Sequence, residues 1–137
     1  MDASEMRARF ANARVARLAT VDEHARPHLV PVCFATEGDA IFSAVDAKPK
    51  STTALRRLDN IAAHPAVSLL VDEYFEDWTR LWWVRADGDA HVVESGPEHR
   101  DAIDRLAAKY PQYRARPPDG AVVAVQVRRW RGWTWNG

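Results

Sequence analysis

Short apolar segments separated by polar turns, without a regular alternation of strand and helix, constrain the fold of this chain most strongly. Val15–Val21 and His28–Thr36 are predicted strands, joined by the polar stretch Asp22-Glu-His-Ala-Arg-Pro27. Ala40–Val45 continues the sheet after the turn Glu37-Gly38-Asp39. Strands linked as hairpins favour an antiparallel sheet or barrel over a doubly wound parallel sheet.

The second half of the chain adds further strands. Val67–Val71 is a predicted buried strand, and Ala121–Trp130 is a long alternating strand. Leu81–Ala86 and Ala90–Val93 are predicted to pair as a hairpin about Asp87-Gly88, because Asp-Gly is a strong turn signal. The sequence has neither a G-x-G-x-x-G nor a P-loop pattern, which argues against a Rossmann domain or a P-loop enzyme.

Three helices are predicted between these strands. The first spans residues 3–13, the second lies near 51–63 with Ser51 or Thr52 as its cap, and Ser95-Gly-Pro-Glu98 reads as a capping box that opens the third. Their apolar faces consist of Met6, Phe10 and Ala13, then Leu55, Leu58, Ile61 and Ala62, then Ile103, Leu106, Ala107 and Tyr110. The expected fold class is therefore mainly β with flanking helices.

Composition limits the classes of partner. The 137 residues fit one domain, 1–137, and Lys plus Arg equals Asp plus Glu at 19 each, so no overall field attracts nucleic acid or an anionic membrane. The sequence has no apolar run long enough for a membrane helix, and its charged N-terminus does not resemble a signal peptide. With one cysteine, Cys33, expected to be a small buried residue, a reducing cytoplasmic location is predicted.

A candidate anion site follows the third predicted strand. Lys48 and Lys50 precede Ser51 and Thr52 at the start of a predicted helix, and Arg56 lies one turn further on. Unpaired amides at a helix N-terminus, together with lysines and hydroxyl groups, are typical of a phosphate site. A capped surface helix with solvated lysines explains the same residues, and the pattern alone leaves both interpretations open.

Pro31 interrupts the apolar segment that contains Val30 and Val32. Because proline cannot donate to a strand ladder, this segment is predicted to be an edge strand or to carry a bulge. The freed backbone groups could face a flat heterocycle, and a plain edge strand is the alternative.

All six tryptophans lie between Trp78 and Trp135. Alternation places Trp83 on one face of its strand and Trp82 on the other, which predicts that the core covers one face and that a partner subunit or a ligand covers the other. Interleaved arginine and tryptophan in the segment 128–135 could stack single-stranded nucleic acid, but the zero net charge favours an interface or ligand-stacking role.

Side-chain constellations for catalysis are weak. His24 and His28 straddle a loop and a strand, so no metal site is predicted, and Cys33 has no setting that would make it a nucleophile. No catalytic residue can be named, and a cofactor would have to supply the reactive group.

Four motifs in order resemble a known family. Ala16-Arg-Leu-Ala-Thr20, Arg26-Pro-His-Leu-Val-Pro-Val32, Lys48-x-Lys50 followed by Leu55-Arg-Arg-Leu58, and Trp78-Thr-Arg-Leu-Trp-Trp-Val-Arg85 run through most of the chain. The series resembles the pyridoxamine 5′-phosphate oxidase-like split-barrel superfamily. It is most similar to the small actinobacterial members predicted to use the deazaflavin coenzyme F420.

The resemblance implies a six-stranded antiparallel split β-barrel of the FMN-binding type, forming a homodimer with two cofactor sites at the interface. It implies that the cofactor phosphate is held by Lys48, Lys50, Ser51 and Thr52, with help from Arg56. It also implies that the ring lies along Val30, Pro31 and Val32, and that Trp78 and Arg80 come from the second subunit.

Two departures from true pyridoxamine phosphate oxidases favour F420 over FMN. Residues 38–41 lack the arginine that clamps the FMN phosphate, and the chain stops without the extension that contacts pyridoxal phosphate. The expected function is an F420-dependent oxidoreductase that transfers a hydride between the reduced deazaflavin and a small unsaturated substrate. The alternatives are an FMN-dependent oxidase or reductase, a non-catalytic flavin- or haem-binding protein with His28 or His64 as ligand, and a structural dimer with no cofactor.

Overall fold

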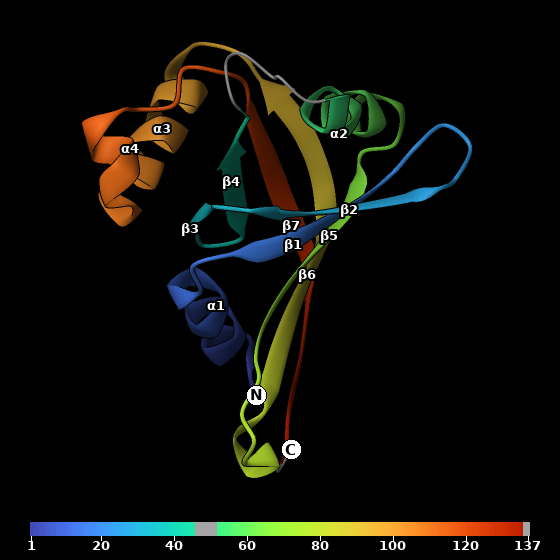
Figure 1. Cartoon of the computed structure of the whole chain (residues 1–137), viewed down its shortest axis with the longest axis vertical. Coiled ribbons are helices and arrows are strands. Elements are labelled where there is room, and N and C mark those ends of the chain that lie inside the picture. The colour runs from blue at the N-terminus through green and yellow to red at the C-terminus, as the bar shows by residue number, and fades with distance from the viewer. Residues whose placement is uncertain (46–51, 136–137) are drawn as a thin grey trace.

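The computed structural model describes residues 1–45 and 52–135, without the side chains of residues 52–55. Seven strands form one curled sheet in the order β2-β1-β5-β6-β7-β4-β3 (Figure 1). The strands are β1 Ala16–Val21, β2 Pro27–Val32, β3 Ala35–Glu37, β4 Ala40–Ala44, β5 Ala66–Glu73, β6 Trp82–Val93 and β7 Val122–Thr134. The helices are α1 Ala3–Asn12, α2 Thr52–Ala63, α3 Pro97–Lys109 and α4 Pro111–Ala115, with a 3-10 turn, η1, at Trp78–Arg80.

Every strand pair in the described sheet is antiparallel, so the predicted mainly β, antiparallel class is confirmed. The predicted strand count was wrong by one. The segment His28–Thr36 breaks after Val32, and its two parts, β2 and β3, form opposite edges of the sheet. Phe34, between them, donates its backbone N–H to the hydroxyl of Tyr110, 3.1 Å away, instead of to a neighbouring strand.

The predicted hairpin about Asp87-Gly88 was also wrong, because β6 runs straight through this dipeptide with a bulge. Val67 of β5 pairs with Gly88 on one side, and Val127 of β7 pairs with it on the other. A Cβ atom at Gly88 would collide with the backbone carbonyl of Gln126. The glycine therefore permits a close approach of two strands, which is the other common reason for a glycine in a strand.

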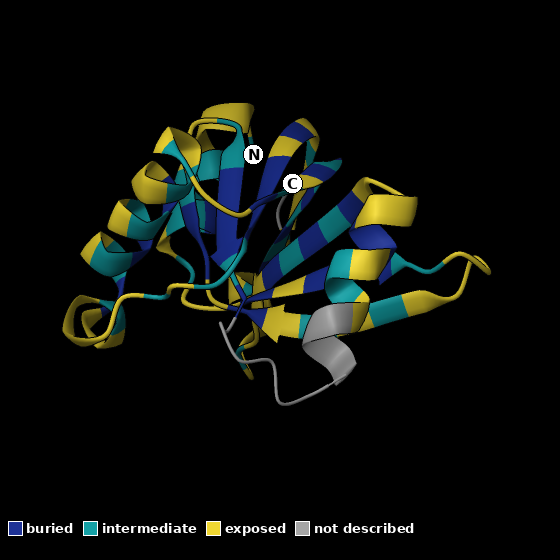
Figure 2. Ribbon diagram, turned by 90° about the horizontal axis from the view of Figure 1, so that it is seen from above, coloured by how far each residue is buried: buried dark blue, intermediate teal, exposed yellow. Residues whose placement is uncertain are grey.

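The core lies inside the curl of the sheet, where the strands are largely buried (Figure 2). Helices α1 and α2 contribute side chains to it. Phe10 of α1 is fully buried, and its ring lies 4.9 Å from that of Phe34 and 5.3 Å from that of Trp130. Ile61 of α2 belongs to the same cluster. On the other side of β4, Phe42 packs against Ala102 of α3. This arrangement buries both faces of β4, while β2 keeps one exposed face.

Helix α3 begins without the predicted capping box. Gly96 is the N-cap residue, with a φ of 94°, and no side chain caps the first turn. Glu98 instead faces His91, with 2.9 Å between Oε1 and Nε2. The proline at the first helical position and the positive φ of glycine are sufficient to start the helix here.

The C-terminal end of α3 is joined to the strands by Tyr110. Its hydroxyl accepts from the Phe34 amide and lies 2.9 Å from the carbonyl oxygen of Arg14. Next to it, the Lys109 ammonium donates to the carbonyl of Ala13, 2.7 Å away, and lies 3.7 Å from the centre of the Phe34 ring. Burial, reinforced by the charge of Arg14, lowers the pKa of Lys109 to about 8.

The expectation for Cys33 was wrong, because this residue is exposed. It alternates with the buried Val32 and Phe34, so the chain turns its side chain outward at the break between β2 and β3. Among the described residues, no helix combines the length and apolarity needed to cross a membrane.

Candidate functional site

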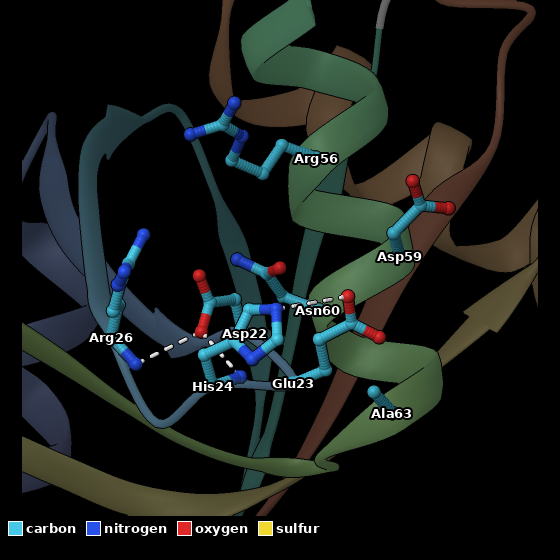
Figure 3. Close-up of a pocket in the computed structure, with 8 residues that line it drawn as sticks. All are labelled: Asp22, Glu23, His24, Arg26, Arg56, Asp59, Asn60 and Ala63. Atoms are coloured by element: carbon cyan, nitrogen blue, oxygen red, sulfur yellow. Dashed lines mark hydrogen bonds and ion pairs between the residues drawn. The ribbon is translucent and has the colours of Figure 1, made fainter.

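A pocket of about 620 Å³ lies between the β1–β2 loop and α2 (Figure 3). We call it the loop–helix pocket. Its lining consists of Asp22, Glu23, His24 and Arg26 from the loop and Arg56, Asp59, Asn60 and Ala63 from the helix.

The loop wall is held in shape by Asp22. One oxygen of its carboxylate, Oδ1, accepts the backbone N–H groups of His24 at 2.8 Å and Arg26 at 2.9 Å. The hydrogen bond from Arg26 is the largest of the effects that lower the pKa of Asp22. Ala25 adopts a φ of 61°, a left-handed conformation that costs a residue with a side chain about 1–2 kcal/mol. The loop thus has a defined shape, and this shape fixes where Arg26 leaves the backbone.

The helix wall is tied to the sheet by Asn60. This side chain is buried and donates from Nδ2 to the hydroxyl of Thr20 on β1, 3.0 Å away, and Thr20 is buried too. A buried hydrogen bond between α2 and β1 fixes the distance between the two walls, because breaking it would leave unpaired polar atoms in the core. Arg56, one turn before Asn60, is exposed and lines the same pocket.

Charges of opposite sign share the pocket without pairing. The guanidinium groups of Arg26 and Arg56 extend along one side of it, and the carboxylates of Asp59 and Glu23 lie on the other (Figure 3). Neither arginine side chain has a hydrogen bond or ion pair with any other residue that the structure describes. Glu23 contacts the His24 ring at 3.4 Å, which is an ion pair only when that ring is protonated.

Of the residues predicted to hold a phosphate, Arg56 is the one whose side chain can be placed. Lys48, Lys50 and Ser51 lie outside the described residues, and Thr52 is the first residue of α2, with no description of its side chain. The start of the predicted helix at this point is confirmed.

The predicted edge position of Val30, Pro31 and Val32 is confirmed, because β2 is the first strand of the sheet. Val32 is buried and Val30 packs against the core, while Pro31 is exposed and pairs with Arg17 of β1. The other side of β2 pairs with no strand among the described residues. A ligand could therefore reach the backbone of β2 from its open edge.

Trp78 and Arg80 lie far from Arg56 within one chain. They form η1, at the lower tip of the molecule, whereas α2 lies at the upper end (Figure 1). The Arg80 guanidinium lies 3.9 Å from the centre of the Phe75 ring, and Trp78 is 55% exposed and packs against Trp135. One chain does not bring these two residues to the loop–helix pocket.

The outer face of the sheet, away from the core, carries both apolar and charged side chains. Leu29, Leu70 and Trp83 help to line a shallow hollow of about 620 Å³ there, and Trp133 pairs with Trp83 on the adjacent strand. We call this surface the outer face. Two polar clusters belong to the same surface, and Arg17, Asp72, Ser68 and Arg85 line the hollow itself. Arg17 pairs with Asp72, and Arg85 and Ser68 contact Asp87.

Arg26, Asp22 and Asn60 were not predicted as site residues. Aspartate at the start of a polar loop after a strand is a sequence signal for the turn that Asp22 makes. Asn60 and Arg26 are 34 positions apart, and no periodicity relates a loop residue to a helix face at that distance. Across the described residues there is no cluster of three metal-ligating side chains.

Comparison with solved structures shows a shared fold. The chain superposes on the conserved hypothetical protein Rv2991 from Mycobacterium tuberculosis with a TM-score of 0.79 and 22% identity, covering 98% of this chain and 85% of that one. An FAD-binding protein from Mesorhizobium loti gives a TM-score of 0.75 with 18% identity, covering 96% of this chain and 94% of that one. HutZ, the haem storage protein from Vibrio cholerae, gives a TM-score of 0.72 with 17% identity, covering 96% of this chain and 93% of that one.

Sequence comparison defines the family. No curated protein matches the chain. The family model described as pyridoxamine 5′-phosphate oxidase matches residues 3–134, which include all seven strands. With the curled antiparallel sheet and the shared fold of its structural neighbours, this match shows that the chain belongs to the pyridoxamine 5′-phosphate oxidase family.

Proposed function

We propose that this protein is an oxidoreductase that binds the deazaflavin coenzyme F420 and reduces a small unsaturated substrate. The observation that carries the proposal is the position of Arg56, which lines the loop–helix pocket one turn after the start of α2. An unpaired guanidinium beside a helix N-terminus suits a phosphate group. The family match supports a flavin-type cofactor.

The donor set fits such a cofactor. Lys48 and Lys50, with the hydroxyls of Ser51 and Thr52, would hold its phosphate, and Arg56 would assist. When bound, the deazaflavin would supply a hydride to the substrate. The open edge of β2 at Val30–Val32 would orient the ring, and the packed core behind Val32 would keep water away from one side of it.

The choice of F420 over FMN rests on the turn between β3 and β4. In place of the arginine that clamps the FMN phosphate in pyridoxamine phosphate oxidases, this turn has Asp39. Its Oδ1 accepts from Arg7 Nε at 2.7 Å and from Trp130 Nε1 at 2.9 Å. Asp39 thus holds α1 against β7, and this turn offers no guanidinium for the phosphate of FMN.

A homodimer belongs to the proposal. The second copy would cover the outer face, where Leu29 is 66% exposed and Trp83 lies beside Trp133. Apolar and aromatic residues flanked by charged pairs are typical of the centre and rim of a protein interface. In this arrangement Trp78 and Arg80 of one copy would approach the cofactor site of the other.

A fluorescence titration with oxidised F420, and with FMN in parallel, tests the cofactor. We expect F420 to bind more tightly than FMN, and the double variant Lys48→Ala/Lys50→Ala to weaken F420 binding by about tenfold or more, because charge-assisted contacts to the phosphate are lost. Arg100→Ala, an exposed substitution on α3, is the matched control.

Tighter binding of FMN would transfer the proposal to an FMN-dependent oxidase or reductase. If neither cofactor binds, the redox function is refuted. A haem-binding protein without turnover is then the second candidate, which the fold shared with a haem storage protein favours.

His64 is the better haem ligand of the two predicted histidines. It is exposed at the end of α2, whereas the Nδ1 atom of His28 is buried and has no hydrogen-bond partner among the described residues. A Soret band that appears with added haem and is lost in His64→Ala would support this second candidate. Retention of the band in that variant would refute His64 as the ligand.

A further inference from the structure

We propose that the loop–helix pocket binds a small zwitterionic ligand, with its carboxylate on Arg26 and Arg56 and its ammonium group on Glu23 and Asp59. The proposal goes beyond the proposed function, because it requires no flavin or deazaflavin. It starts from the separation of charge in Figure 3, where two arginines and two of the three lining carboxylates, Glu23 and Asp59, lie on opposite sides of the pocket and do not pair with each other.

The four side chains are exposed and leave two different elements. Here the backbone keeps them apart. Arg26 leaves a loop whose shape is set by two hydrogen bonds to Asp22 and by the left-handed Ala25. Arg56 and Asp59 are fixed on a helix that Asn60 anchors to β1. A left-handed alanine is a strained feature, and such strain gathers at binding sites.

The balance of charge favours a ligand with both signs. The lining carries two arginines and three carboxylates, so it offers partners for both a negative and a positive group of one ligand. Asp22 lies near Arg26, but one of its oxygens is already engaged by two backbone amides. Glu23 lies on the same side of the pocket as Asp59 and forms no ion pair with either arginine, so these two carboxylates can accept from one ammonium group.

The chemistry and size of the pocket point to an amino acid or a dipeptide. A planar guanidinium binds a carboxylate through two parallel hydrogen bonds, and two such groups on different elements fix its orientation. Carboxylates on the opposite side accept from an ammonium group. A volume of about 620 Å³ accommodates a molecule of this class with room for water.

A titration followed by nuclear magnetic resonance tests the proposal on the whole, cofactor-free protein. The probes are glycylglycine, N-acetylglycylglycine, which lacks the ammonium group, and glycylglycinamide, which lacks the carboxylate. We expect saturable shifts of the amides of residues 22–26 and 59–63 with glycylglycine. We expect about tenfold weaker binding of both blocked probes, because each loses its charge-assisted contacts on one side.

Arg26→Ala and Asp59→Asn should each weaken glycylglycine binding by about tenfold, and Arg100→Ala should not change it. Both positions are exposed and the backbone bonds of Arg26 do not involve its side chain, so the variants should unfold at the wild-type temperature. Equal binding of the three probes, no saturable shift with glycylglycine, or full binding by Arg26→Ala would each overturn the proposal.

The experiment separates this inference from the proposed function. Arg26 and Asp59 are not among the residues proposed to hold the cofactor, and the titration contains none. If glycylglycine fails to bind while F420 binds, the zwitterion site alone is refuted. If glycylglycine binds while F420 and FMN do not, the cofactor proposal alone fails.

Discussion

Lys109 gives the protein an alkaline dependence of stability that a single substitution should remove. Burial lowers its pKa to about 8 in the folded state, from an ordinary value near 10.5 in the unfolded chain. Between these two values the unfolded state binds more protons, so the free energy of unfolding should rise with pH from about 8 upward. Urea unfolding at intervals between pH 7.5 and 9.5 measures this rise. Lys109→Met should abolish it, and an unchanged rise in that variant would contradict the assignment.

Gly88 and Gly38 are glycines for two different reasons, namely lack of space for a Cβ atom at Gly88 and a left-handed backbone at Gly38. Alanine at Gly88 would collide with the Gln126 carbonyl, so we expect Gly88→Ala to cost about 1–3 kcal/mol in free energy of unfolding. Gly38 has a φ of 57° and open space around it, so Gly38→Ala should cost about 1–2 kcal/mol from backbone conformation alone. Substitution by Asn, which tolerates a left-handed conformation, should recover stability at Gly38 and should lower it further at Gly88. Recovery at both positions would refute the steric explanation.

At the scale of elements, the hydroxyl of Tyr110 joins α3 to the start of β1 and to the break between β2 and β3. Tyr110→Phe would leave the buried Phe34 amide without an acceptor, so we expect a loss of about 1–3 kcal/mol. Tyr74→Phe removes an exposed hydroxyl, which accepts from Trp78 Nε1 at 3.3 Å, and should cost much less. Chemical denaturation of both variants measures the difference. Equal losses would mean that burial of the Phe34 amide carries no special cost.

The sequence predicts elements well where one local pattern decides them. The apolar face of α1, the edge position of Pro31 and the start of α2 all depend on a few neighbouring residues, and all are confirmed. Predictions were wrong where a distant element decided the outcome. Gly88 follows an aspartate as in a hairpin turn, but β5 and β7 on its two sides keep β6 straight. The outward turn of Cys33 depends in the same way on Tyr110, because this residue holds the adjacent backbone.

The candidate site was partly predictable for the same reason. Arg56 stands in a local motif at a helix start, which a sequence pattern can identify. Arg26 becomes its neighbour in the loop–helix pocket only after the sheet curls and Asn60 bonds to Thr20, a contact between residues 40 positions apart. Residues such as Arg26 and Arg56, which only the fold brings together, cannot be identified as neighbours from a local sequence pattern.

At the scale of the whole molecule, the outer face predicts an association that mutation should weaken. Leu29→Glu places a charge on the proposed interface in place of an exposed apolar side chain, so we expect a monomer at concentrations at which the wild-type protein is a dimer. Ala108→Glu, on the exposed side of α3, should leave the dimer intact. Sedimentation equilibrium measures both variants. A wild-type monomer, or a Leu29→Glu dimer of unchanged affinity, would contradict the proposed arrangement.

The order of strands in the sheet has a consequence for synthesis on the ribosome. The β3–β4 hairpin joins the rest of the sheet through β7 alone among the described strands, and β7 follows every other strand in the chain. Until residues 122–134 emerge from the exit tunnel, β6 has an open edge and the hairpin has no partner. The β3–β4 hairpin therefore stays unpaired from its own synthesis until β7 is made, and the edge of β6 stays open over the shorter interval between β6 and β7. Unpaired strand edges can pair with other chains, so we expect chaperones that shield such edges to bind this nascent chain.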